Sequence, residues 1–138
     1  MRLTTTEIRY MSLFESITGA LARDCIVEDN SVVFVVKEGN MGLAIGKNGR
    51  NVRRLEQILG KRVELVEYAP DLKQFLKNVF YPANVLNVNV VERNGKRTVY
   101  VIIDSKDRRT FSRRIGGRVR LARLLARRHF GVDNVVVA

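Results

Sequence analysis

The chain of 138 residues contains little of what several common functions require. Its single cysteine, Cys25, excludes a framework of internal disulfides and suits a reducing compartment. Its single histidine, His129, leaves too few ligands for a zinc site. The longest apolar runs, Val32–Val36 and Val99–Ile103, span five residues each, which is too short to cross a bilayer. We therefore expect a cytoplasmic protein that needs no metal and no cofactor and has no membrane partner.

Patterns typical of catalysis are also missing. The sequence has no cysteine–histidine motif, no serine in the setting of a nucleophile elbow, and no carboxylate pair with an evident common substrate. A phosphate-binding P-loop would need Ser or Thr after Gly46-Lys47, where the chain has Asn48. Ala44 breaks the glycine spacing of a dinucleotide-binding fold. We expect no enzyme and no catalytic residue.

Acidic residues are scarce in the second half of the chain. The whole chain has 25 Lys and Arg against 14 Asp and Glu, a net charge of +11. Residues 1–69 hold ten basic and nine acidic side chains, whereas residues 70–138 hold fifteen and five. Within Lys106–Arg128, ten bases accompany one acid, Asp107. Such clustering favours a polyanionic partner, either nucleic acid or anionic lipid, over the alternative of a merely solvated charged surface.

One order of predicted elements occurs twice along the chain. In residues 1–69, a helix, a strand hairpin, a glycine-rich stretch, a second helix and a final strand follow one another. Residues 70–138 repeat this order, with Pro70 at the boundary. We therefore predict an α/β (α+β) protein of two tandem domains, 1–69 and 70–138, each a three-stranded sheet covered by helices. The alternative is a single α+β domain with an accidental repeat. Because each domain would bury little surface alone, we expect the two to pack on each other.

Local signals place the elements of the first domain. Two runs rich in β-branched residues, Cys25–Glu28 and Ser31–Lys37, predict a hairpin with Asp29-Asn30 at its turn. The first helix is expected to follow the threonines at 4–6 and to carry an apolar stripe of Ile8, Met11, Phe14, Ile17 and Leu21.

The second domain has clearer signals. Asp71 is a helix cap, and Pro82 ends the helix that it begins. Asn94-Gly95 between two apolar runs predicts a two-residue hairpin turn. The last helix is expected from about Gly117 to Phe130, ahead of a final strand.

A G-x-x-G pattern lies between two helical segments in Ile45–Val52, which reads Ile-Gly-Lys-Asn-Gly-Arg-Asn-Val. Glycines lack Cβ atoms, so the backbone can turn sharply and a sugar-phosphate chain can lie directly against it. The amides at the start of the following helix point at that chain. Lys47 and Arg50 add charge and donors for phosphate, and Asn48 is too small to block the approach. The plain alternative is a glycine turn with both cations solvated.

The segment Ile45–Val52 resembles the signature loop of a KH domain, and the order of elements resembles the type II, prokaryotic arrangement. KH domains clamp about four nucleotides of single-stranded nucleic acid with this loop. Two tandem copies over nearly the whole chain resemble the paired KH region of NusA-type transcription factors in their short archaeal form, and the stretch Gly117–Gly131 adds to the match. The resemblance implies a non-enzymatic, RNA-binding regulator of transcription elongation or termination. It also implies that Ile45 and Val52 pack against bases, although both residues can equally belong to the core.

The second domain departs from the KH pattern. Aligning Val119 with Val52 places Arg113–Gly116 over Gly46–Gly49, so arginine replaces the first glycine and a branched residue fills the third position. Only the last glycine remains, with Gly117 beside it. We therefore predict a degenerate loop whose contact with RNA depends more on charge than on close backbone approach.

Arginines form a stripe on the last predicted helix. Arg120, Arg123 and Arg127 lie three and four residues apart, so they share one face that can follow a phosphate backbone. The alternatives are solvated surface arginines or a helix lying on a membrane surface. The apolar side, which is expected to pack on the sheet, contains Val119, Leu121, Ala122, Leu125, Ala126 and Phe130.

Together, these patterns predict a monomer that binds single-stranded RNA. RNA polymerase is a further candidate partner, although bacterial NusA proteins use additional domains for polymerase contact, for which 138 residues have no room. The alternatives are a ribosome-associated or RNA-processing KH protein, and KH domains used for protein docking. The residues predicted to contact RNA are Ile45, Gly46, Lys47, Asn48, Gly49, Arg50, Arg53, Arg113, Arg114, Gly116, Gly117, Arg118, Arg120, Arg123 and Arg127.

Overall fold

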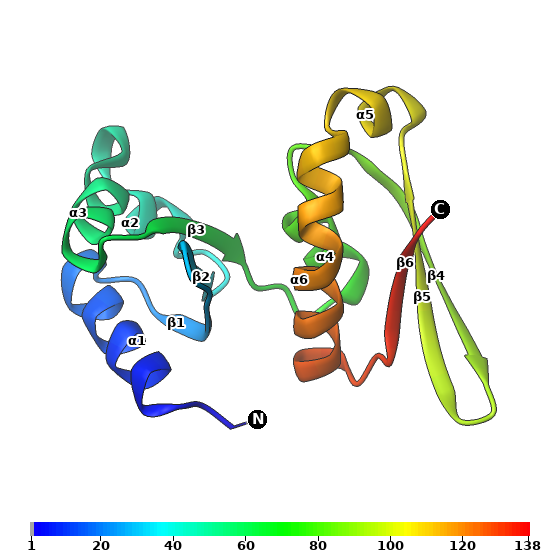
Figure 1. The fold of residues 1–138 in the computed structure, drawn as a ribbon, viewed down its shortest axis with the longest axis horizontal. Helices are drawn as coiled ribbons and strands as arrows, with labels where there is room; N and C mark the ends of the chain where they lie inside the picture. The colour runs from blue at the N-terminus through cyan, green and yellow to red at the C-terminus, as the bar shows by residue number, and fades with distance from the viewer. Residues whose placement is uncertain (1) are drawn as a thin grey trace. The chain divides into compact units, whose positions relative to one another are not determined.

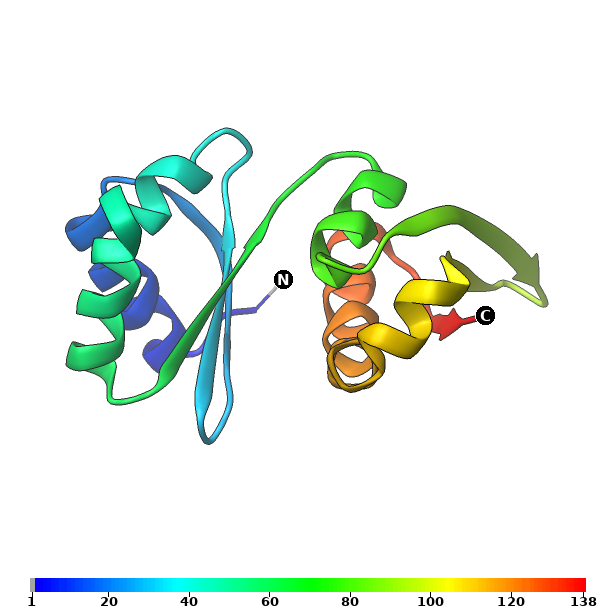
Figure 2. The ribbon, with the colours of Figure 1, turned by 90° about the horizontal axis from the view of Figure 1, so that it is seen from above.

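The computed structural model describes residues 2–138, and the chain divides into two compact units. The first unit ends at Ala69, and the second runs from Pro70 to Ala138. Each unit has one three-stranded sheet with helices packed on it (Figures 1 and 2). The predicted fold class, a mixed α/β protein with two three-stranded sheets covered by helices, is therefore confirmed.

The first unit has the predicted order of elements. They are α1 (Thr5–Thr18), β1 (Ala22–Val27), β2 (Ser31–Val36), α2 (Met41–Ile45), the 3-10 turn η1 (Lys47–Gly49), α3 (Arg50–Leu59) and β3 (Arg62–Glu67). Strand β2 is central in the sheet, antiparallel to β1 and parallel to β3. The parallel pairing requires a crossover, which α2 and α3 supply.

Helix α1 begins at a capping box. The Thr4 hydroxyl accepts from the Glu7 amide at 3.1 Å, and the Thr4 amide donates to a Glu7 carboxylate oxygen at 2.8 Å. Gly19, in a left-handed conformation, ends the helix. The predicted apolar stripe is wrong at both ends. Leu21 lies beyond the helix, and Ile8 is 54% exposed because it lies on the solvent side of α1.

The core of the first unit lies between its sheet and its helices. Phe14 of α1 stacks on Phe34 of β2 with ring centroids 4.6 Å apart. Cys25 of β1 is fully buried in the same cluster, where it acts as a small apolar side chain. Ala44 of α2 and Leu55 of α3 are also fully buried there. The core therefore fixes both helices that flank the glycine loop.

The second unit repeats the same order. Its elements are α4 (Leu72–Phe80), β4 (Val85–Arg93), β5 (Lys96–Ile103), α5 (Ser105–Thr110), α6 (Ser112–Phe130) and β6 (Asn134–Val137). Strand β5 is central, antiparallel to β4 and parallel to β6. The Asp71 side chain accepts from the Gln74 amide at 3.0 Å and caps α4, as predicted. Asn94 and Gly95 both have positive φ, which confirms the two-residue hairpin turn.

Helix α6 is longer than the sequence predicts. It begins at Ser112, not near Gly117, so the predicted degenerate loop at 113–116 is wrong and this segment is helical. The reason is visible in the burial pattern: Ile115 and Arg118 are buried three residues apart, in step with the apolar positions further along the helix. The neighbouring glycines fall on the exposed side, where they do not end the helix.

The helices of the second unit cover one side of its sheet (Figure 1). Helices α4 and α6 pack on each other, with the rings of Phe75 and Phe130 5.4 Å apart. Buried side chains of β5 and β6, among them Val99 and Val135, complete this core. The opposite side of the β4–β5–β6 sheet, which we call the outer face of the second sheet, carries partly and fully exposed side chains.

Candidate nucleic-acid interface

The Gly46–Gly49 loop joins α2 to α3 through three residues with positive φ. Gly46 has φ 75° and ψ 168°, a combination that is essentially restricted to glycine. Asn48 (φ 57°) and Gly49 (φ 75°) are left-handed, a conformation that asparagine tolerates better than most residues. The sequence Gly-Lys-Asn-Gly thus suits the backbone at each position that departs from ordinary helix geometry.

Asn51 holds the loop from within α3. Its side-chain amide donates to the carbonyl of Leu43 at 2.9 Å and so ties α3 to α2. A Cβ atom on Gly46 would lie 2.8 Å from Asn51 Cγ, closer than real contacts allow. Gly46 is therefore required both for its dihedral angles and for its lack of a side chain. Sequence reasoning does not select Asn51. The sequence feature that could have indicated this role is the position of Asn51, an amide side chain two residues after Gly49.

Arg53 supports the other end of the loop. Its guanidinium donates to the carbonyl of Asn48, and a Cβ atom on Gly49 would lie 3.2 Å from Arg53 Nη1. The side chain is also exposed. Arg53 thus has a structural role in the loop, and its predicted contact with RNA stays a prediction.

The loop presents positive charge to solvent. Lys47, Asn48 and Arg50 are exposed. Within residues 2–138, neither Lys47 nor Arg50 has an ion pair or a side-chain hydrogen bond. No side chain of the described residues caps the N-terminus of α3, so the positive end of the helix dipole lies at the same corner. An anionic oxygen at this corner would meet two cations and a helix N-terminus without displacing an existing ion pair.

The two apolar residues beside the loop differ. Val52 packs against the core cluster of the first unit, so its role is structural. Ile45 is 40% exposed, and Leu43 on the same short helix is 54% exposed. The expectation that an apolar side chain packs on a base therefore rests on Ile45, with Leu43 as a neighbour that the sequence analysis does not select.

The equivalent corner of the second unit has a different geometry. Only Phe111 separates α5 from α6, and its φ of −112° is not left-handed. Gly116 and Gly117 are exposed inside α6, and a Cβ atom on either would meet nothing within 4 Å. These two glycines do not open the backbone to a close approach, because they lie within a regular helix rather than in a loop.

The predicted basic residues of this corner fall into two groups. Arg113 and Arg114 are exposed in the first turn of α6, and Arg114 Nε donates to the Tyr81 carbonyl at 2.6 Å. Arg118 is only 5% exposed, against the prediction that it faces RNA. The reason is its position on the core side of α6, three residues after Ile115.

The arginine stripe of α6 is exposed but only partly free. Arg123 Nε donates to the side chain of Asn134 at 2.8 Å, and its Nη2 reaches the Val135 carbonyl at 3.4 Å. Arg127 Nη2 donates to the Asp133 carbonyl at 3.1 Å. These contacts fasten α6 to the start of β6. Arg120 has no such bond within the described residues, so it is the most available cation of the stripe.

Metal and membrane sites receive no support from this part of the chain. No group of three or more His, Cys, Asp or Glu side chains among residues 2–138 is placed to hold a metal ion. None of the described helices combines the length and apolar character needed to span a bilayer.

Comparison with known protein families supports the assignment of the first unit. The model of the KH domain family matches residues 7–70, which include the whole Gly46–Gly49 loop. The order of elements, the sheet topology and this loop therefore define a KH-domain protein.

The relatives cover almost the entire chain. It is 41% identical over 137 residues to a probable transcription termination protein NusA of Methanococcus vannielii, with coverage of 99% of this chain and 79% of that protein. It is 40% identical to a protein of the same name from Halococcus morrhuae, with 99% and 97% covered. The crystal structure of APE1850 matches with a TM-score of 0.87 at 40% identity, covering 99% of this chain and 100% of that chain. The chain belongs to the archaeal NusA family, which confirms the predicted resemblance.

Proposed function

We propose that this protein is a non-enzymatic transcription factor of the NusA type that binds single-stranded RNA and acts on elongation or termination. The observation that carries the proposal is the Gly46–Gly49 loop. Gly46, Asn48 and Gly49 hold positive φ angles that turn the backbone sharply, Lys47 is exposed beside them, and α3 begins directly behind the loop without a side-chain cap. This combination suits a sugar-phosphate chain.

In this proposal, the residues of the first unit make different kinds of contact with the RNA. The loop backbone lies against the sugar-phosphate chain, and Lys47 and Arg50 supply charge to its phosphates. Asn48 offers a small polar side chain, and Ile45 offers an exposed apolar surface to a base. In the second unit, Arg113 and its neighbours on α5 and α6 act through charge, since no open loop is present there.

The test uses the charge-reversing double variant Lys47→Asp/Asn48→Asp. Binding of a fluorescently labelled single-stranded RNA is measured by anisotropy at several salt concentrations. Affinity is expected to fall by at least about tenfold, since each lost hydrogen bond to a charged group is worth about 1.5–3 kcal/mol. The matched control is Arg9→Asp/Gln57→Asp, which makes the same charge change at exposed positions of α1 and α3 in the same unit.

The two double variants separate the possible outcomes. A loss confined to the loop variant supports the assignment. Equal losses in both would show that only net charge matters, and wild-type affinity in the loop variant would refute the loop as the RNA site. For the wild type, the logarithm of the binding constant should fall with the logarithm of salt concentration by about 0.7 per phosphate contacted.

The role in transcription adds further parts to the proposal. It includes a cytoplasmic, monomeric protein that also contacts RNA polymerase. The relatives from Methanococcus vannielii and Halococcus morrhuae carry the name transcription termination protein, which supports this role. Co-purification with polymerase, rather than with ribosomal subunits, is the expected result. Light scattering gives the oligomeric state, and transcription assays that compare the wild type with the loop variant test whether RNA binding alters termination.

A further inference from the structure

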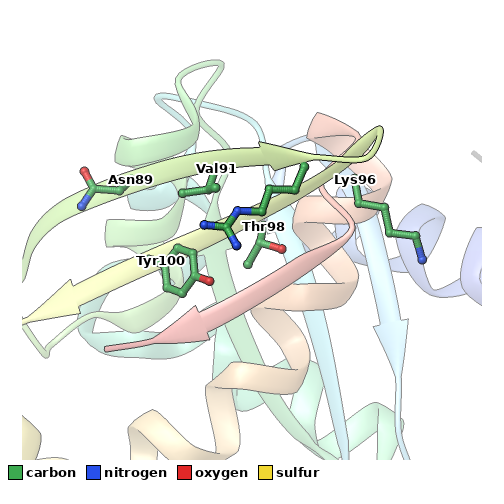
Figure 3. A pocket seen from close by; sticks show the side chains of 6 residues that line it. Asn89, Val91, Lys96, Thr98 and Tyr100 are labelled. Atoms are coloured by element: carbon green, nitrogen blue, oxygen red, sulfur yellow. The ribbon is translucent and has the colours of Figure 1, made fainter.

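The outer face of the second sheet gathers a distinct set of side chains. In the β4–β5 register, Asn89 pairs with Tyr100, Val91 with Thr98, and Arg93 with Lys96. Because residues two apart along a strand point to the same side, these six share one face, opposite the helices. They line a hollow of about 480 Å³, and Figure 3 shows five of them with labels, along the two strands of the hairpin.

The hollow has an aromatic end and a cationic end. Tyr100 is 37% exposed and lies toward the middle of the sheet. Arg93 and Lys96 lie at the hairpin tip, next to the Asn94-Gly95 turn, and both are exposed. Tyr100 lies four positions after Lys96 along β5, which corresponds to about 13 Å. The ring and the cations are therefore far enough apart to contact different parts of one extended ligand.

Polar groups lie between the two ends. Asn89 lies directly across from Tyr100 and accepts a hydrogen bond of 3.3 Å from the Asn87 side chain on the same face. The side-chain NH₂ group of Asn89 remains a donor for a ligand. Thr98 adds a hydroxyl, and Val91 opposite it adds an apolar contact. An exposed ring flanked by amide and hydroxyl groups can stack with a base and bond to its edge.

The charge of this face selects the class of ligand. No acidic residue lines the hollow, whereas two of its six residues are cations. Within residues 2–138, neither Arg93 nor Lys96 has an ion pair or a side-chain hydrogen bond. The unit that carries the hollow holds fifteen of the chain's 25 basic residues. A negatively charged ligand with flat aromatic groups fits these features better than an apolar protein surface does.

We propose that the outer face of the second sheet is a second binding surface for single-stranded RNA. A base stacks on Tyr100, and a neighbouring phosphate lies against Arg93 and Lys96. This surface is separate from the α5–α6 corner and uses the sheet instead of the helices. The inference rests on the proposed function, since it requires that the protein binds RNA at all.

The experiment compares three substitutions of Tyr100 by the anisotropy assay with a long single-stranded RNA. Loss of base stacking in Tyr100→Ala should weaken binding by about 5- to 150-fold. Tyr100→Phe keeps the ring and should bind within about twofold of wild type. Tyr100→Leu keeps an apolar strand residue without an aromatic ring, so it should bind as weakly as the alanine variant. Ultraviolet crosslinking of the bound RNA should map to Tyr100 or its neighbours.

A second variant tests the cations at the hairpin tip, where a substitution does not disturb the packing of the strands. Arg93→Glu/Lys96→Glu lies at the exposed hairpin tip and should weaken binding at least tenfold and lower the salt dependence. Wild-type affinity in Tyr100→Leu and in the tip variant overturns the inference. If the loop variant Lys47→Asp/Asn48→Asp loses binding in the same assay, the proposed function nevertheless stands. Tyr100-dependent binding of an acidic peptide with unchanged RNA affinity would also overturn it.

Discussion

The two units use the same order of elements but build different corners between their second and third helices. In the first, the four residues Gly46–Gly49 separate α2 from α3, and three of them have positive φ. In the second, Phe111 alone separates α5 from α6, and the helix that follows has 19 residues instead of 10. One fold can therefore carry a tight glycine loop at this corner or a nearly continuous basic helix, depending on a short segment of sequence.

This difference predicts two modes of attraction. A tightly turned loop selects ligands by shape, because a sugar-phosphate chain must fit against its backbone. Arginines on a helix act over longer distances and are weakened by salt. The distribution of charge agrees with this division, since residues 70–138 have a net charge of +10 and residues 1–69 of +1.

Gly46→Ala should have the largest effect. The residue is in a conformation that adds about 1–3 kcal/mol of strain to other residues, and a Cβ atom would lie 2.8 Å from Asn51. We expect the first unit to lose about that much stability and the protein to lose RNA affinity. Denaturant unfolding and anisotropy measure the two effects. The matched control is Gly42→Ala in α2, where a Cβ atom meets nothing within 4 Å. Unchanged RNA affinity in Gly46→Ala would contradict the role of the loop conformation in RNA binding.

Arg123→Ala and Arg120→Ala should separate structure from charge on α6. Arg123 bonds to Asn134 and Val135, so its loss should lower the free energy of unfolding by about 1 kcal/mol. The Arg120 side chain has no hydrogen bond or ion pair within the described residues, so its loss should change the free energy of unfolding by less than about 0.5 kcal/mol. If α6 follows RNA, Arg120→Ala should reduce the salt dependence of binding by about 0.7, the contribution of one phosphate. An unchanged salt dependence would remove this side of α6 from the RNA path.

Gly116→Ala should have a small effect, and it should be stabilising. Alanine is favoured over glycine inside a helix by about 0.5–1 kcal/mol, and the added Cβ atom meets nothing. The same change at Gly131, which ends α6 with a φ of 64°, should be destabilising because the residue is left-handed. Thermal unfolding of both variants tests whether residues 113–116 are a helix. Destabilisation by Gly116→Ala would argue for a loop there, as in the first unit.

Many boundaries of the helices and strands can be predicted from single residues that cap helices or form turns. Thr4 before α1, Asp71 before α4 and the Asn94-Gly95 turn each satisfy a specific backbone requirement and mark real boundaries, whereas Thr5 and Thr6 belong to α1 itself. The loop around Gly46 was also recognisable, since its glycines and Asn48 match the dihedral angles that the backbone adopts. The packing of the two units on each other stays a prediction.

The errors occur where tertiary packing overrides local signals. Two adjacent glycines suggest a break before α6, yet the core contact of Ile115 extends the helix through them. From the sequence, Arg118 resembles the other surface cations of this segment. The helix places it on the side of α6 that faces the core, so it is buried. Tyr100 is not among the residues predicted to contact RNA, although the two-residue turn at Asn94-Gly95 fixes the strand register that brings it to one face with Arg93 and Lys96.

The fully buried thiol of Cys25 has a practical consequence. A thiol-specific reagent can reach it only when the first unit opens, so the rate of labelling reports the local unfolding of that unit. The second unit has no cysteine and stays silent in such a measurement. One unmodified chain therefore carries its own reporter of how RNA protects one half of the molecule, without an added dye or an engineered residue.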